Sequence, residues 1–414
     1  MKKIYTSIDI GSDSIKILVA EIFRDSLNVL AQTEVKSKGI KKGVIVDANE
    51  SLISIKEAIN SIEGKLGVKI DKVIALIPSY NADYDIVSGS LTITNEEKKV
   101  TGNDITRVLQ TCIYNKITEN RELVTLIPID FSLDDNKSIK YPKGLVGNKL
   151  GVKAMMVTTP KKNVYSIISI MQSLGVEVID INISGIADYN EFRTKETDKK
   201  VGAIINIGAE TTTISLFNKG IIVKSEVLQI GGKNIDNDIS YVFKLEKNDS
   251  KKIKENFSVA HKRFSQVNEV YEMLNINKDL IKITQYDLSQ VVMSRVMEIL
   301  KLSKKQTYLL TNKEIQYIII TGGTSELPGI TYLISEEFGV ETRIGNIDTV
   351  GVRNNKYSTV SGLVRCFYDK LKLRGKEYSM FTFDKQEDIS SPKKILNFSN
   401  ESVLGKVFGY FFDS

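Results

Sequence analysis

The sequence has few of the residues on which many catalytic and metal-binding sites depend. Its two cysteines, Cys112 and Cys366, lie far apart and have no second Cys or His at ligand spacing. We therefore expect neither a disulfide framework nor a zinc site, and a reducing compartment fits this usage. The single histidine, His261, precedes Lys262 and Arg263. This context indicates a surface residue and argues against Ser-His-Asp or histidine-metal catalysis.

Long apolar runs are lacking as well. No stretch approaches the roughly 18 consecutive apolar residues of a spanning helix, so we expect any membrane contact to be peripheral. The chain opens with two lysines like a secretory signal, but Asp9 interrupts the apolar run and no cleavage site follows, which favours a first strand. The net charge of +6 is a mild excess over 414 residues. Because no stripe of arginines and aromatics occurs, we expect no nucleic-acid partner.

The chain contains a strand–turn–strand pattern that occurs twice. Residues 4–10 and 15–22 are β-branched runs around a glycine, and 201–207 and 211–217 repeat them. Strands alternating with helices predict an α/β fold with mixed sheets, and two related halves suggest a ligand cleft between them. Apolar spacing predicts the helices 49–66 (capped by Asn49), 163–174, 246–275 and 285–302.

Four glycine-containing turns follow predicted strands. A glycine lets backbone N–H groups approach phosphate oxygens, and neighbouring hydroxyls and lysines add donors. Each turn alone is better explained as an ordinary hairpin turn, but four in this order, two of them opening the related halves, favour a phosphate-binding site. Their polar and glycine residues are Asp9, Gly11, Ser12, Ser14 and Lys16; Asn206, Gly208, Thr211 and Thr212; Gly231 and Gly232; and Gly322, Gly323 and Thr324.

The order of these turns resembles the actin, Hsp70 and sugar-kinase superfamily of ATP-binding proteins. Further segments resemble the FtsA family in particular, and the resemblance covers roughly residues 1–372 and the last dozen. The stretch 127–150 is its most specific part, because other superfamily members lack the subdomain, called 1C, to which it is similar. The segments are 38–47, 127–135, 142–150, 340–345 and 361–363.

The resemblance implies an actin-like two-domain fold with a central nucleotide cleft, an inserted FtsA-type 1C subdomain and a C-terminal amphipathic helix. It also implies a division of the chain. The expected parts are subdomain 1A at 1–82 (with 161–195 and 345–372), subdomain 1C at 83–160, subdomains 2A/2B at 196–344, a flexible linker at 373–400 and a membrane-targeting helix at 401–414.

ATP and Mg²⁺ are the cofactors that the resemblance implies. The expected ATP contacts are the turn residues above together with Lys254, and Asp9 and Asn206 are expected to hold Mg²⁺ through water. The chain departs from the superfamily where Asn206 and Thr213 replace aspartates and Lys251 replaces a glutamate. An amide cannot supply a carboxylate's charge to Mg²⁺. We therefore expect ATP binding with weak or absent hydrolysis, and name no catalytic base.

The last segment of the chain has an apolar helical face. The resemblance implies that this helix lies in the membrane interface, whereas the alternative is a tail that docks in its own core or in a neighbouring subunit. The polar stretch 375–400 before it favours the membrane. The free energy gained by partly burying six apolar side chains barely exceeds the conformational-entropy cost of folding the segment. Single molecules should therefore bind the membrane weakly, and filaments that present many tails should bind it tightly. The face comprises Val403, Leu404, Val407, Phe408, Phe411 and Phe412.

The expected function is that of an ATP-binding, actin-like protein that polymerises on the inner face of the cytoplasmic membrane and anchors the FtsZ ring at the bacterial division septum. The implied partners are the FtsZ C-terminal tail, through about 235–310, further copies of this chain and an anionic membrane surface. Two alternatives remain: a non-enzymatic adaptor resembling the pilus-assembly protein PilM, and a small-molecule kinase of the superfamily, which would need a carboxylate base facing a substrate pocket.

Overall fold

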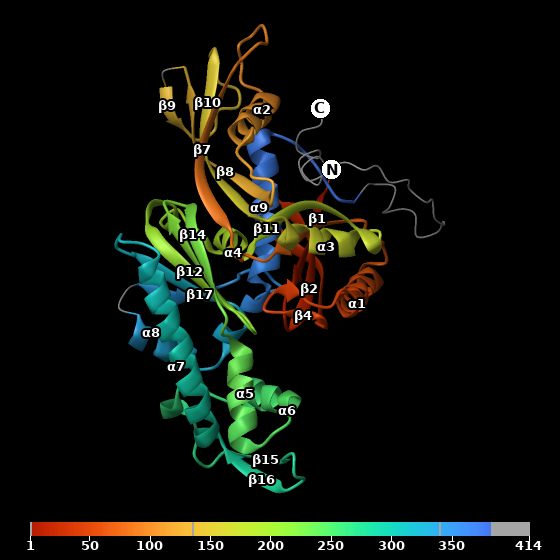
Figure 1. Cartoon of the computed structure of the whole chain (residues 1–414), viewed down its shortest axis with the longest axis vertical. Coiled ribbons are helices and arrows are strands. Elements are labelled where there is room, and N and C mark those ends of the chain that lie inside the picture. Colours follow the sequence, from red (N-terminus) through yellow and green to blue (C-terminus); the bar gives the residue numbers. More distant parts are fainter. Residues whose placement is uncertain (1, 135, 339–340, 382–414) are drawn as a thin grey trace.

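The computed structural model describes residues 2–134, 136–338 and 341–381. Three larger β-sheets with their helices form two halves and an outlying lobe. In Figure 1 the lobe lies at one end of the long axis, the sheets of the two halves lie at the same level in the middle, and the second half extends to the other end. Strands and helices alternate along most of the chain, so the predicted α/β class is confirmed. The amphipathic helix expected at 401–414 lies outside the described residues.

The first half is built on a five-stranded sheet in the order β11-β6-β1-β2-β3. β1 and β2 form the predicted antiparallel hairpin, and β6 pairs in parallel with both β1 and β11. Nearly every side chain of β1 and β2 is buried, including the polar Thr6, Ser7 and Ser14, so neither strand alternates between buried and exposed residues. The strands, with the short hairpin β4–β5, are β1 (Lys3–Ile10), β2 (Ser14–Phe23), β3 (Ser26–Lys36), β4 (Ile40–Lys41), β5 (Val44–Ile45), β6 (Lys72–Ile77) and β11 (Glu177–Ile183).

Two helices cover this sheet, α1 (Ala48–Leu66) and α3 (Lys161–Ser173). The expected cap of α1 at Asn49 is wrong, because Asp47 is the residue whose side chain accepts a hydrogen bond from the backbone N–H of Glu50. Asn49 instead lies inside the first turn. α1 ends at Gly67, whose φ of 73° is a left-handed conformation that glycine adopts without strain.

The outlying lobe is a four-stranded antiparallel sheet in the order β7-β10-β8-β9, with α2 packed against β7 and β10. It has a hydrophobic core of its own. α2 begins with a reciprocal capping box between Thr101 and Asp104. The lobe comprises β7 (Asp83–Thr92), α2 (Gly102–Ile113), β8 (Arg121–Leu133), β9 (Asn136–Ile139) and β10 (Lys149–Pro160).

The second half repeats the hairpin of the first on a sheet in the order β14-β13-β12-β17-β18. β12 and β13 are antiparallel and β17 pairs with β12 in parallel, as β6 does with β1. The helix expected over 246–275 is wrong beyond Phe257, where α6 ends. The elements are β12 (Val201–Ile207), β13 (Thr212–Asn218), β14 (Ile221–Leu228), α5 (Gly232–Phe243), α6 (Lys247–Phe257), β15 (Val270–Leu274), β16 (Leu280–Thr284), α7 (Gln285–Leu309), β17 (Tyr317–Thr321), α8 (Ile330–Glu337) and β18 (Thr342–Ile344).

Two helices cross where the halves meet, α4 (Ser184–Phe192) and α9 (Ser358–Arg374), and Figure 1 shows α9 running from this junction towards the outlying lobe. The crossing is close because it is made at Gly362. A Cβ atom placed on Gly362 would lie 1.8 Å from the carbonyl oxygen of Ala187 in α4. Short 3₁₀ turns complete the chain: η1 (Thr197–Lys199), η2 (Lys262–Phe264), η3 (Gly323–Glu326) and η4 (Asn355–Tyr357).

Residues 376–381, here called the strap, run back from the end of α9 along β1. The Met380 N–H donates to the Ile4 carbonyl at 3.0 Å, and the Tyr5 hydroxyl donates to the Tyr378 carbonyl at 3.0 Å. A linker was expected from residue 373, but α9 continues to Arg374 and the strap is packed on the first half. None of the helices in the described ranges is long and apolar enough to cross a membrane.

Candidate functional site

A cleft of about 720 Å³ lies where the two halves face each other. Its walls come from the turns that follow β1, β12 and β17, from α5 and α6, and from the stretch before α9. Most of the predicted site residues therefore meet in one place. Those that line the cleft are Asp9, Gly11, Ser12, Ser14, Lys16, Asn206, Gly208, Thr211, Gly232, Lys254, Gly322, Gly323 and Thr324.

The first turn is closed by a hydrogen bond from the Gly11 N–H to the Ser14 carbonyl, 3.2 Å long. A Cβ atom on Gly11 would lie 2.9 Å from that carbonyl, so the turn requires glycine. The Ser14 hydroxyl already donates to Glu34 at 2.8 Å. The Ser12 hydroxyl accepts from the Gly43 N–H at 2.6 Å and keeps its own proton. Of the two predicted hydroxyl donors, Ser12 is thus the one able to serve a ligand.

The second turn has the same geometry, and hydrogen bonds connect it to the third and fourth turns. The Gly208 N–H donates to the Thr211 carbonyl at 2.9 Å, as Gly11 does to Ser14. The Gly208 carbonyl accepts from the Gly232 N–H at 2.9 Å and from the Thr324 hydroxyl at 3.3 Å. One carbonyl oxygen therefore connects the turns at 208, 232 and 324, which are far apart in sequence.

Two predicted contacts lie behind the turns rather than in the cleft wall. Thr212 is fully buried, and its hydroxyl donates to the Ile230 carbonyl at 2.8 Å. A Cβ atom on Gly231 would lie 2.6 Å from the Gly208 carbonyl oxygen. These residues hold the turns against each other, and neither lines the cleft.

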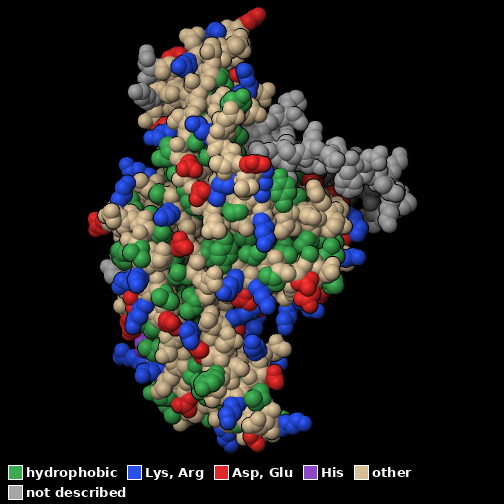
Figure 2. Space-filling model, viewed as in Figure 1, with side chains coloured by type: hydrophobic (Ala, Val, Ile, Leu, Met, Phe, Trp, Pro, Cys, Tyr) green, Lys and Arg blue, Asp and Glu red, His purple; other side chains and the backbone are tan. Residues whose placement is uncertain are grey.

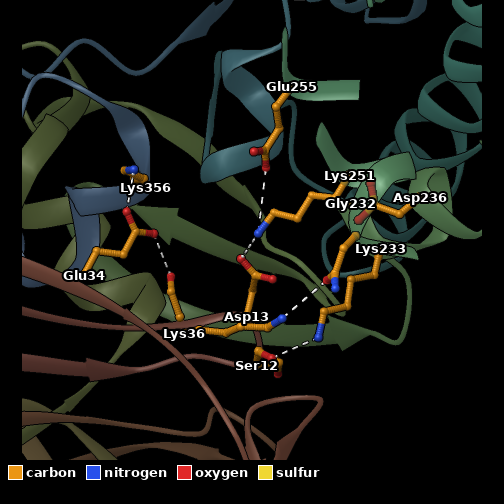
Figure 3. Close-up of polar contacts among 12 residues, drawn as sticks. Ser12, Asp13, Glu34, Lys36, Gly232, Lys233, Asp236, Lys251, Glu255 and Lys356 are labelled. Carbon is orange, nitrogen blue, oxygen red and sulfur yellow. Dashed lines mark hydrogen bonds and ion pairs between the residues drawn. The ribbon is translucent and has the colours of Figure 1, made fainter. Parts of the chain in front are cut away.

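Two lysines of α6 reach the cleft and form ion pairs there. Lys254 lies 2.7 Å from Asp236 of α5, and burial raises the pKa of that carboxyl in spite of the lysine. Lys251 crosses the cleft to the carboxylate of Asp13 in the first turn, at 2.7 Å (Figure 3). Burial would raise the pKa of Asp13, but the hydrogen bond and charge of Lys251 outweigh it and the pKa is lowered.

Further contacts join the halves beside this ion pair. Lys233, the second residue of α5, donates to the Ser12 carbonyl at 3.0 Å (Figure 3) and to Glu210 at 2.8 Å. The Lys42 N–H in the β4–β5 turn donates to the other oxygen of Glu210. Sequence reasoning named neither Lys233 nor Asp13 as functional, although both lie within or next to the predicted glycine turns.

The two residues expected to hold Mg²⁺ through water both line the cleft. Asp9 accepts from the Thr359 hydroxyl at 3.0 Å, and the Asn206 amide nitrogen donates to Asp188 at 2.7 Å. Burial raises the pKa of Asp188 to about 7. Across the described ranges, no three His, Cys, Asp or Glu side chains gather into a metal-binding group. A cation here would therefore keep most of its water or share a ligand's oxygens.

The donors of the cleft suit a phosphate chain. Backbone approach is open at Gly323, where an added Cβ would meet only a Lys356 side-chain atom at 3.9 Å. α5 begins at Gly232 and presents its N-terminus to the cleft, an end that attracts anions. Lysine side chains add positive charge from both halves, among them Lys16 and Lys233. Outside the cleft, Figure 2 shows Lys and Arg spread among Asp and Glu rather than gathered in one stripe.

Comparison with known proteins identifies the family. Residues 203–362 match the model of "Cell division protein FtsA", and residues 83–158, the outlying lobe, match that of the "SHS2 domain inserted in FTSA". The cell division protein FtsA of Streptococcus pneumoniae is 29% identical over 87% of this chain and 79% of its own length. FtsA of Bacillus subtilis is 26% identical over 91% of this chain and 86% of its own length.

Solved structures show the same architecture at low sequence identity. A PilM–PilN type IV pilus biogenesis complex superposes with a TM-score of 0.58 at 14% identity, over 87% of this chain and 97% of that one. MreB5 of Spiroplasma citri bound to ADP gives 0.53 at 13% identity, over 90% of this chain and 98% of that one. These likenesses confirm the predicted actin-like fold. The two family models together span more than half of the sequence, and the chain belongs to the FtsA family of cell division proteins.

Proposed function

We propose that this protein binds ATP with Mg²⁺ in the cleft, assembles head to tail into filaments on the inner face of the cytoplasmic membrane, and anchors FtsZ there during division. The observation that carries the nucleotide part is the convergence of the turns at Gly11, Gly208 and Gly322 on one cavity. Its size, its backbone donors and its lysines suit a nucleoside triphosphate. MreB5, of similar fold, is bound to ADP in its own structure.

Bound Mg²⁺ would neutralise charge on the phosphates, and the residues available to hold its water shell are Asp9 and Asn206. One carboxylate and one amide supply less negative charge than two carboxylates would. We accordingly propose that ATP is bound as a structural ligand and turned over slowly or not at all. The nucleotide would join the two halves, which makes the closed cleft the state able to assemble.

Assembly and membrane attachment rest on the family and on the C-terminal sequence. Head-to-tail contacts between identical subunits generate open filaments. The apolar face from Val403 to Phe412 gives each subunit a weak membrane contact, and a filament multiplies it by avidity. The predicted site is the cytoplasmic face of the cell membrane at the division septum.

For FtsZ we propose the surface formed by residues 235–310. A groove of about 600 Å³ runs along α7 in this region, with Met293 and Met297 in its wall and Lys262 and Lys301 beside them. Methionines adapt to varied apolar side chains, and flanking lysines favour acidic neighbours. The groove therefore suits a short peptide with apolar and acidic residues, such as a chain terminus captured as a helix.

The pilus-adaptor alternative has one observation in its favour, the fold shared with the PilM–PilN complex. That fold is common to both functions, whereas the SHS2 match belongs to FtsA. The kinase alternative needs a free carboxylate base beside the phosphate site. Most of the carboxylates that line the cleft are paired with lysines, namely Asp13, Asp236, Glu34, Glu210 and Glu255. Asp9 and Glu326 accept from Thr359 and from the Asn355 N–H instead, so the kinase alternative would depend on one of these two. ATP turnover that rises on addition of a sugar or short-chain acid would support a kinase.

Co-sedimentation with anionic lipid vesicles, with and without ATP and Mg²⁺, tests the proposal. We expect the full chain to pellet with vesicles and ATP to increase the pelleted fraction. A protein that stays monomeric and in the supernatant throughout would contradict the proposed assembly. A chain ending at residue 401 is the matched control: it should still bind ATP while losing the vesicles.

A further inference from the structure

A buried carboxylate lies directly beneath the cleft, at the junction of the halves. Asp188 of α4 has no solvent exposure. Its two oxygens contact two other elements: Ser358, the first residue of α9, and Asn206, near the end of β12. Asn206 in turn lines the cleft. A single side chain of the interdomain helix thus connects the first half to a residue of the second half that faces the cleft.

The hydrogen bonds define how the Asn206 amide is turned. The Ser358 hydroxyl donates to Asp188 Oδ1 at 2.7 Å, and the Asn206 Nδ2 group donates to Asp188 Oδ2 at 2.7 Å. An ionised carboxylate only accepts hydrogen bonds, so in that state of Asp188 the nitrogen of the amide must face it. The oxygen then points the other way. Its position is marked by Gly322, where an added Cβ would lie 2.6 Å from Asn206 Oδ1.

We propose that Asp188 is a positioning residue that turns the Oδ1 atom of Asn206 into the cleft, where it accepts hydrogen bonds from the hydrated cation of the bound nucleotide. This inference rests on the proposed nucleotide binding. Burial raises the pKa of Asp188 to about 7, so above that pH its negative charge lies one layer below the amide and reinforces the attraction for a cation. Asp188, behind Asn206, thus supplies the carboxylate that position 206 lacks.

The same arrangement explains why residue 206 is an amide. A carboxylate at 206 would lie within hydrogen-bond distance of Asp188, and two carboxylates at such a separation, one of them fully buried, cannot both be ionised. The pair therefore tolerates one acid and one amide. Exchanging the two residues would keep the hydrogen bond and bring the carboxylate to the cleft.

Thermal unfolding without nucleotide tests the pairing itself. We expect N206D to lower the Tm by about 5 °C, because it places a second carboxylate within hydrogen-bond distance of the buried Asp188. The exchange variant D188N/N206D should recover most of that loss. The pairing would be overturned if N206D had the same Tm as the natural chain, or if the exchange variant D188N/N206D recovered none of the lost Tm.

The matched control separates a specific pair from the general cost of a buried charge. Asn182 is an amide of the junction that is itself buried, and its side chain donates to Cys366 rather than to a carboxylate. We expect N182D to lower the Tm as well, but D188N should give it no recovery. Equal recovery of N182D and N206D by D188N would show that the effect is not a pair and would contradict the proposal.

Binding of a fluorescent ATP analogue at increasing Mg²⁺ tests the role of the pair towards ligand. D188N should reduce the gain in affinity that Mg²⁺ brings by about tenfold and leave Mg²⁺-free affinity within about twofold. The exchange variant should restore the gain. An unchanged Mg²⁺ gain in D188N would reject the positioning role. If the natural chain binds no adenine nucleotide, both the proposed function and this role of Asp188 are wrong. The Tm values of the variants would still show whether Asp188 and Asn206 form a specific pair.

Discussion

At the scale of single residues, the cleft is crossed by charges that satisfy one another in the absence of a ligand. Lys251 comes from the second half and Asp13 from the first, and their side chains are 37% and 27% exposed. A phosphate chain entering the cleft would attract the lysine and repel the aspartate. The ion pair therefore holds the halves together and competes with the ligand for Lys251.

Replacing Asp13 by asparagine should separate these two effects. The free energy of unfolding should fall by less than about 1 kcal/mol, because the pair is partly exposed. ATP affinity should rise about three- to tenfold, since Lys251 is released and a negative charge is removed. Isothermal titration and urea unfolding measure the two quantities. A fall in ATP affinity would contradict this account of the pair.

Asp238 provides the matched control, because it forms an ion pair of similar exposure with Arg295 within the second half. D238N should change stability by a similar amount and leave ATP affinity unchanged. The pH dependence of D13N has a definite sign. Because Lys251 lowers the pKa of Asp13 below 3.8, the stability difference from the natural chain should be present above about pH 4 and be lost as pH falls further.

Residue-scale prediction from sequence succeeded where the signal is local. Gly11 and Gly208 each follow a strand and close a turn that leaves little or no room for a side chain. The local pattern of a strand followed by Gly and hydroxyl residues indicates such a turn. Asp188 and Lys233 could not be found this way. Lys233 contacts Ser12 across 221 positions of sequence, and a helix interior gives no sign that Asp188 will face an amide on another element.

At the scale of elements, the junction depends on how closely α4 and α9 approach. In G362A the new methyl group would overlap the Ala187 carbonyl, which is backbone and cannot turn aside. We expect a loss of about 3 kcal/mol in the free energy of unfolding, measured by urea denaturation. Gly64, in α1, is an exposed helical glycine with open space around it.

G64A is therefore the control substitution, and it should stabilise the protein by about 0.5–1 kcal/mol because alanine favours the helix. If G362A were as stable as the natural chain, the helices would be free to separate, and the close crossing would not define the junction.

Element prediction failed mainly where a tertiary contact ends a helix. The polar stretch 246–275 was expected to be largely helical, yet α6 ends at Phe257. Soon afterwards the Ala260 N–H is bound by the Pro328 carbonyl at 2.7 Å, a partner that no local pattern reveals. The β15–β16 hairpin did have a local signal, because Asn275 accepts from the N–H groups of two residues in its turn.

At the scale of the whole molecule, the strap joins the far end of the described chain to its first strand. A chain ending at residue 381 keeps the strap and is the reference for a shorter truncation. A chain ending at 374 loses the buried Met380 side chain and the hydrogen bonds to β1. We expect that shorter chain to lose about 2–4 kcal/mol.

Circular dichroism during urea unfolding measures both truncations. If the shorter chain were as stable as the longer one, the strap would add nothing to the fold. The repeated halves followed from the sequence, because each strand–turn–strand unit carries its own pattern, and the inserted lobe followed from the family resemblance of 127–150. The strap did not, since it begins a stretch, 375–400, whose composition is polar overall, and its partner strand lies at the opposite end of the chain.

Because the strap fixes Phe381 beside β1, every residue after it starts from a known point on the body. Covalent geometry lets the chain from there to Ser414 reach at most about 120 Å. Whatever holds the last residues must lie within a sphere of that radius centred on the first half. The origin of that sphere, rather than the length of the chain alone, determines which sides of the body can turn towards the anchoring surface.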